Sequence, residues 1–197
     1  MENDVQKSWE RFLNPETLRN NLIAASIYIA AFEILKQSVV DRIKGFFSDG
    51  FDQGGPIIGE EYGKEVLSKN KSPTYASLLW LEGMGAITKS DIEQFEAIKA
   101  YRNELAHEIT NFLSKGLKLG HAELFGEMVK LLRKIEVWWI VNVELPTNPD
   151  WNGEEVNEEG IIPGPIWSLQ LMTEIALGND ERASYYYNEF IKTKSKI

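Results

Sequence analysis

The chain has 197 residues, of which 43% are hydrophobic and 26% are charged, and this balance predicts one globular domain over residues 1–197. It contains no cysteine, which excludes disulfides and thiolate sites, and its two histidines disfavour a histidine metal centre. The net charge of −9 argues against a non-specific nucleic-acid coat, because neutralising phosphates requires clustered cations. An enzyme with a small basic cleft and a protein with a basic partner both remain compatible with this charge.

The first long helix is predicted over residues 15–47. Asn14 is suited to cap this helix, and Pro15 suits its first position. The apolar run 22–35 is too short for a membrane span and contains Glu33, so it indicates a buried core helix. Because no signal-peptide pattern precedes it, we expect a cytoplasmic protein without a membrane partner.

Further helices are predicted at 73–83, 89–114, 121–145, 165–177 and 180–193. A capping box of Ser90 and Glu93 opens the second of these, and Pro146 ends the third. Residues 57–72 carry at most a short helix. No segment shows sustained strand alternation, so the expected class is all-α, a bundle of four long helices with two short C-terminal helices.

Arg102 is the anomalous residue of the helix predicted at 89–114. On a helical wheel it falls within the apolar face of that helix. Asn103 and His107 are four residues apart, so they lie together at the edge of the face. Glu33 lies among apolar residues of the first helix, and we predict that it pairs with Arg102. Spacing alone leaves open whether this is a structural ion pair or part of a functional site.

The stretch AYRNELAHE resembles the signature of HEPN domains, in which an arginine followed by a polar residue precedes a histidine at this spacing. The matching positions are Arg102, Asn103 and His107. The resemblance covers residues 15–143 and implies an HEPN-like helical bundle. An acidic loop at 146–165 and a C-terminal helical extension at 166–197 lie outside it.

The resemblance implies a metal-independent endoribonuclease that needs no cofactor and cleaves RNA through attack by the ribose 2′-hydroxyl. Such domains act in toxin–antitoxin, phage-defence or RNA-processing systems, so it also implies RNA and a possible antitoxin or other protein as partners. Family members form homodimers in which two motifs face one cleft. His107 would move the proton and Arg102 would stabilise phosphate charge, with Asn103 and Glu33 in support. Other HEPN domains are non-catalytic dimerisation or adaptor modules that bind protein or nucleotide, and this is the alternative.

Lys130, Arg133 and Lys134 share one face of the helix at 121–145. Such a cluster is most often a solvated face, but it is a candidate set of substrate-phosphate contacts if it borders the cleft. His121 opens the same helix and is interpreted as a residue of the cap region rather than a catalytic one.

Overall fold

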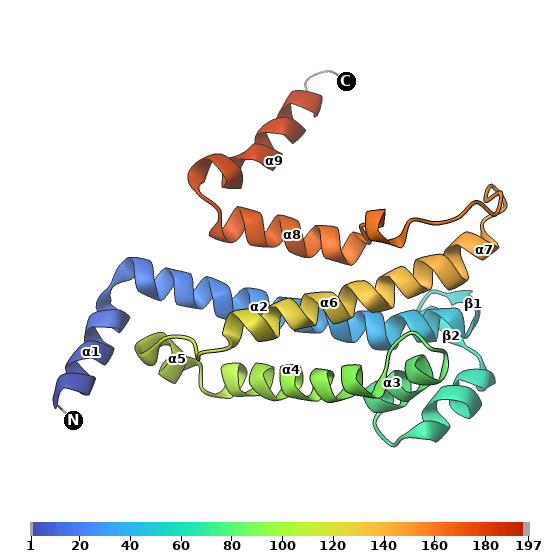
Figure 1. The fold of residues 1–197 in the computed structure, drawn as a ribbon, viewed down its shortest axis with the longest axis horizontal. Coiled ribbons are helices and arrows are strands. Elements are labelled where there is room, and N and C mark those ends of the chain that lie inside the picture. The colour runs from blue at the N-terminus through green and yellow to red at the C-terminus, as the bar shows by residue number, and fades with distance from the viewer. Residues whose placement is uncertain (1, 195–197) are drawn as a thin grey trace.

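The computed structural model describes residues 2–194, and its helices confirm the predicted all-α class (Figure 1). The four helices of the predicted bundle are α2 (Pro15–Phe46), α3 (Pro73–Gly83), α4 (Lys89–His107) and α6 (His121–Trp139), of which α3 has only 11 residues. The other α-helices are α1 (Glu2–Leu13), α5 (Ile109–Lys115), α7 (Leu145–Thr147), α8 (Gly164–Leu177) and α9 (Asp180–Lys194). Residues 195–197 of the predicted C-terminal extension lie outside the described residues.

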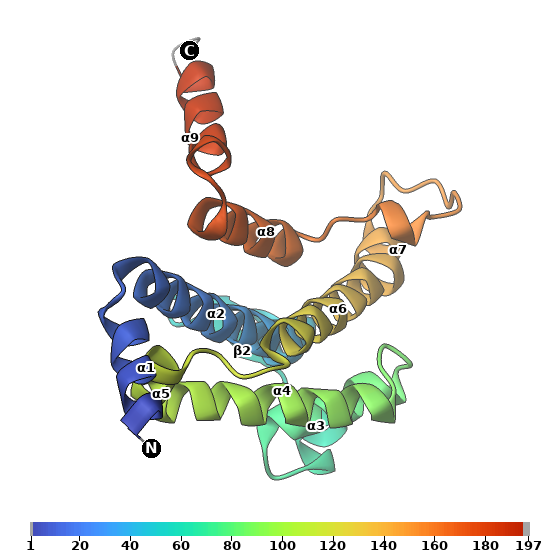
Figure 2. The ribbon, with the colours of Figure 1, turned by 60° about the vertical axis from the view of Figure 1, so that its left-hand side comes forward.

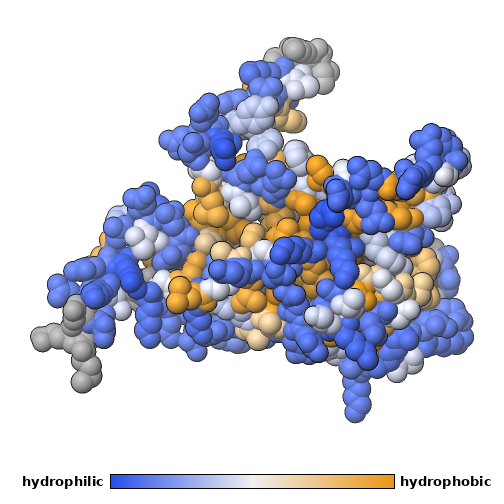
Figure 3. All heavy atoms as spheres, in the orientation of Figure 1, coloured by the Kyte–Doolittle hydropathy of each residue, from blue (hydrophilic) through white to orange (hydrophobic). Residues whose placement is uncertain are grey.

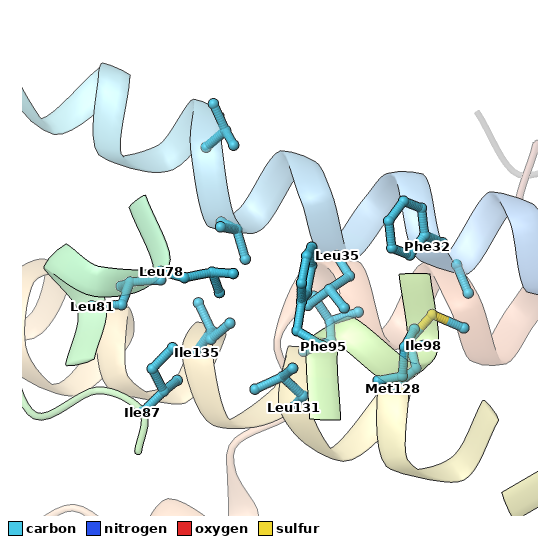
Figure 4. Packing of buried hydrophobic residues seen from close by; sticks show 14 of the residues in the cluster. Phe32, Leu35, Leu78, Leu81, Ile87, Phe95, Ile98, Met128, Leu131 and Ile135 are labelled. Carbon is cyan, nitrogen blue, oxygen red and sulfur yellow. The ribbon is translucent and has the colours of Figure 1, made fainter. Parts of the chain in front are cut away.

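Helix α2 is the central element of the core. Its Asn14 cap accepts a hydrogen bond from the Thr17 amide at 3.0 Å, as the sequence predicted. Figure 4 shows how its buried side chains meet those of α3, α4 and α6; the labelled residues are Phe32, Leu35, Leu78, Leu81, Ile87, Phe95, Ile98, Met128, Leu131 and Ile135. By length and composition alone α2 also satisfies the requirements of a membrane span, but 50% of its apolar window is buried inside the protein.

The start of α4 differs from the prediction. Thr88 is the N-cap: its Oγ1 accepts from the Asp91 amide at 3.3 Å, and the Asp91 carboxylate accepts from the Thr88 amide at 2.7 Å. The predicted capping box of Ser90 and Glu93 is therefore wrong, because the box that forms begins two residues earlier. Both pairs have the spacing of a capping box, but only Thr88 has the extended backbone that a cap requires (φ −111°, ψ 170°), whereas Ser90 lies inside the helix.

The helix predicted at 89–114 is interrupted at Glu108. The backbone leaves helical geometry there (φ −115°, ψ 29°), and α5 begins at Ile109. The new direction buries Phe112 edge-on against Tyr101, with ring centroids 6.1 Å apart. His107 is consequently the last residue of α4 rather than part of a longer helix.

A hairpin and a helix were not predicted. Residues 48–58 form an antiparallel hairpin of β1 (Ser48–Asp52) and β2 (Gly55–Ile58). Gly55 has a φ of +116°, which favours glycine at the turn. The other element is α1, which packs against α5 and is tied to it by a hydrogen bond of 2.6 Å from Arg11 Nη1 to the Lys115 carbonyl.

Helices α8 and α9, residues 164–194, are called the C-terminal arm below. Helix α8 lies across α2 and α6, whereas α9 packs on α8 and points away from the rest of the molecule (Figures 1 and 2). The arm follows the long loop after α7, which crosses the surface with little regular structure.

Candidate functional site

The ion pair predicted between α4 and α2 is present. Arg102 Nη2 lies 2.6 Å from Glu33 Oε1, and Arg102 Nη1 donates a hydrogen bond of 3.3 Å to Asn103 Oδ1. The guanidinium carbon lies 5.5 Å from the centroid of the Phe32 ring, at cation–π distance. Arg102 Nε is buried and has no hydrogen-bond partner among the described residues. The contacts to Glu33 and Asn103 thus fix the guanidinium, and its Nε remains a buried donor that these contacts do not use.

This pair forms part of a pocket of about 150 Å³ between α2, α4 and the start of α3. Its lining residues are Phe32, Glu33, Lys36, Thr74, Phe95, Lys99, Arg102 and Asn103. Lys36 Nζ lies 3.5 Å from the second Glu33 oxygen, and Lys99 Nζ donates to the Tyr75 hydroxyl at 3.2 Å. The lining therefore holds three cationic side chains and one carboxylate, so the pocket is locally positive on a protein of net charge −9.

His107 lies just beyond the pocket. It is exposed at the C-terminal end of α4 and does not line the pocket. Asn103 does line it, and His107 follows Asn103 by four residues, about 6 Å further along the same helix face. The structure therefore brings Glu33, Arg102 and Asn103 together and leaves His107 at the rim.

The predicted substrate-binding lysines are engaged elsewhere. Lys130 pairs with Glu127 at 2.7 Å, and Lys134 pairs with Asp91 at 2.5 Å. Partial burial opposes the effect, but the hydrogen bonds from Lys134 and Thr88 lower the pKa of Asp91. Lys134 thus joins α6 to the cap of α4.

Arg133, the third member of that cluster, anchors the acidic loop. Its Nη2 donates to the carbonyls of Glu158, Glu159 and Ile161 at 2.7, 3.1 and 3.3 Å. With Lys130 and Lys134 it borders a second pocket of about 390 Å³, which shares no lining residue with the Arg102 pocket. The structure does not bring this cluster to the predicted site.

His121 connects α4 to α6. Its Nδ1 lies 3.0 Å from the Tyr101 hydroxyl, and its ring lies 5.3 Å from that of Tyr28. Burial lowers the pKa of His121, which favours the neutral ring. Its contacts are those of a packed residue at the start of α6.

A second arginine–glutamate pair was missed in the sequence. Arg42 of α2 donates to Glu136 of α6 through Nε and Nη2, with contacts of 3.1 and 2.7 Å to Glu136 Oε2, and its Nη1 reaches Glu144 at 2.5 Å. Glu136 is 1% exposed. The available signal was an acidic residue within the apolar stretch IEVWWIV, the same signal that drew attention to Glu33.

Comparisons with protein-family models, with curated proteins and with solved structures find no match to this chain.

Proposed function

We propose that the protein is a metal-independent endoribonuclease of the HEPN type, with its site at the end of α4. The observation that carries the proposal is the positive pocket of Lys36, Lys99 and Arg102 with His107 one turn beyond its Asn103 rim. Guanidinium and ammonium groups recognise phosphate, and a histidine next to that phosphate transfers protons near neutral pH.

In the proposed reaction the RNA phosphate binds at the pocket mouth. His107 removes the proton from the ribose 2′-hydroxyl, whose oxygen attacks the adjacent phosphorus and expels the 5′-oxygen of the next nucleotide. Arg102, fixed by Glu33, stabilises the negative charge that develops on the phosphate oxygens. Asn103 orients the substrate or the imidazole.

One copy offers a single histidine at this position, yet the leaving oxygen also needs a proton. A homodimer that brings two copies of His107 to one cleft would provide both the base and the acid, and water is the other possible acid. The dimer is therefore part of the proposal.

The first test is cleavage of varied RNAs in the presence of a chelator. Wild type is expected to cleave, whereas His107→Ala and His107→Asn are expected to lose about 100-fold or more in rate, as for removal of a general acid–base group. Circular dichroism checks that the variants are folded. Equal cleavage by wild type and His107→Ala, or no cleavage by either, would contradict the proposal.

Two lysines of α2 provide a matched pair for the phosphate contact. Lys36 and Lys44 each pair with an acidic residue three positions earlier, at 3.5 and 3.6 Å, and are 49% and 41% exposed. Lys36 lines the pocket and Lys44 does not. Lys36→Gln should raise KM for RNA several-fold, and Lys44→Gln should leave it unchanged.

A non-catalytic HEPN-like module that binds protein or nucleotide is the second candidate. The 2.6 Å pair between Arg102 and Glu33 favours it, because that contact also suits a structural tie between α4 and α2. This candidate requires that Arg102→Ala unfolds the protein while His107→Ala changes neither stability nor binding. A folded Arg102→Ala variant that has lost RNA cleavage would reject it.

A further inference from the structure

The C-terminal arm exposes large hydrophobic side chains on both of its helices. They are Trp167, Met172, Ile175, Leu177, Tyr185, Tyr187, Phe190 and Ile191. Within α8, which is described throughout, Leu169 is the one buried residue. The apolar side chains of α8 are spread over all sides of the helix, and a helix of that kind is normally buried. Figure 3, drawn in the orientation of Figure 1, shows hydrophobic surface across the middle of the molecule, around α8.

The accessible surface of the whole chain is also larger than that of a compact monomer. It is 12919 Å², whereas a folded monomer of 22.5 kDa exposes about 9,500 Å². The excess of about 3,400 Å² is several times the area of about 800 Å² that each partner buries in a standard protein interface. Both α9 and α1 project from the rest of the molecule, so part of the excess surface belongs to the arm (Figures 1 and 2).

The charges of the arm favour a second copy of the chain as the occupant. The first turn of α9 is acidic, with Asp180 and Glu181, and its last turn is basic, with Lys192 and Lys194. Two α9 helices that pack antiparallel would place each acidic end beside a basic end. Their antiparallel helix dipoles would also attract each other. A net charge of −9 disfavours contact between copies in general, whereas the charges of the arm nearly cancel, with four acidic and three basic residues over 164–194.

We propose that the C-terminal arm is a two-fold interface between copies of this chain, formed by antiparallel packing of α9 on α9. Tyr187 and Phe190, which are 69% and 65% exposed, are the central contacts. They are three residues apart and so lie on one side of the helix. The proposed interface lies outside the helices of the proposed ribonuclease site. The interface proposal therefore does not depend on that function.

The first experiment measures assembly mass by sedimentation velocity on the full chain. Wild type should sediment at no less than twice the 22.5 kDa chain mass, and Phe190→Asp should weaken association at least tenfold. Phe51→Asp is the control, because Phe51 is 79% exposed on the β1–β2 hairpin and should not affect association. Circular dichroism should be the same for all three proteins, because both side chains are exposed.

The second experiment tests the antiparallel orientation. The variant D180K/E181K carries two basic ends and the variant K192E/K194E carries two acidic ends, so neither should associate with itself through α9. When the two are mixed, every end meets its opposite, and a mixed assembly should form. Differently tagged copies allow that assembly to be isolated and counted.

A monomeric wild type overturns the proposal, and so does a Phe190→Asp variant with the mass of the wild type. Self-association of either charge variant at wild-type strength overturns the antiparallel arrangement, because only a parallel pair would already place like-charged ends together in the wild type. Failure of the two variants to associate on mixing overturns the pairing of charges between the α9 helices. A monomer that instead binds RNA through Tyr187 would also overturn it, since the aromatic side chains would then be stacking on bases.

Discussion

Two arginine–glutamate pairs join α2 to its neighbours, and their surroundings give them different roles. Glu136 is 1% exposed, and Arg42 donates to both of its oxygens. Glu33 is 39% exposed, and its partner Arg102 has a buried Nε without a hydrogen-bond partner among the described residues. Both pairs line pockets, of about 370 Å³ for Arg42 and Glu136 and about 150 Å³ for Arg102 and Glu33. In the first pair the hydrogen bonds from Arg42 engage both oxygens of a buried carboxylate, whereas the second lies beside two lysines and a histidine, which makes it the better candidate for binding a phosphate.

The buried pair leads to a prediction about stability. Arg42→Met leaves the Glu136 carboxylate buried without its cation, so it should lower the free energy of unfolding by about 3 kcal/mol. Lys64→Met removes an exposed partner of Glu61 and should cause a much smaller loss, because exposed ion pairs are screened by solvent. Urea denaturation of the two variants measures both values. Equal losses would mean that Glu136 does not depend on Arg42.

At the scale of single elements, the two ends of α4 depend on different interactions. Its start is set by the Thr88–Asp91 box, to which Lys134 of α6 adds an ion pair of 2.5 Å. Its end at His107 has neither glycine nor proline and follows from the packing of α5. That end leaves the histidine exposed beside the pocket, as the proposed chemistry requires.

The cap yields a direct comparison between two hydroxyl residues. Thr88→Ala should lower the free energy of unfolding by about 1 kcal/mol, because it removes the side-chain acceptor for the Asp91 amide. Ser90→Ala lies within the helix and should change stability by less than about 0.5 kcal/mol. Thermal or urea unfolding checks both. A larger loss for Ser90→Ala would return the cap to the position that the sequence first suggested.

At the scale of the whole molecule, the charge distribution limits how RNA can bind. The candidate site offers three cations per copy, and the Lys130, Arg133 and Lys134 cluster is committed to contacts within the protein. Acidic residues dominate the composition as a whole, with 30 aspartates and glutamates against 21 lysines and arginines. The proposed RNA binding would therefore rely on few phosphate contacts and on the shape of the cleft.

The small number of phosphate contacts predicts that the binding constant for RNA depends only weakly on salt concentration. With about 0.7 released counterions per phosphate contact on a single strand, three contacts give a slope of about −2 per copy in a plot of log K against log salt. Fluorescence anisotropy with a short single-stranded RNA and His107→Ala, which should bind without cleaving, measures the slope. A slope steeper than about −6 would show that a larger basic surface takes part.

The sequence by itself determined the helical class, the approximate bounds of the main helices and the pairing of Arg102 with Glu33. Helical periodicity decides which side chains share a face, so two charges on two apolar faces could be matched without coordinates. The sequence did not reveal α1, the β1–β2 hairpin or the pair of Arg42 and Glu136.

Only the tertiary structure decided which capping box is used, where α4 ends and which basic residues remain near the pocket. Each of these depends on contacts between segments far apart in the chain. Lys134 meets Asp91 because α6 packs on α4, and Arg133 is held by the carbonyls of the acidic loop. Local patterns describe what a helix can present, whereas packing determines which of those groups are already engaged.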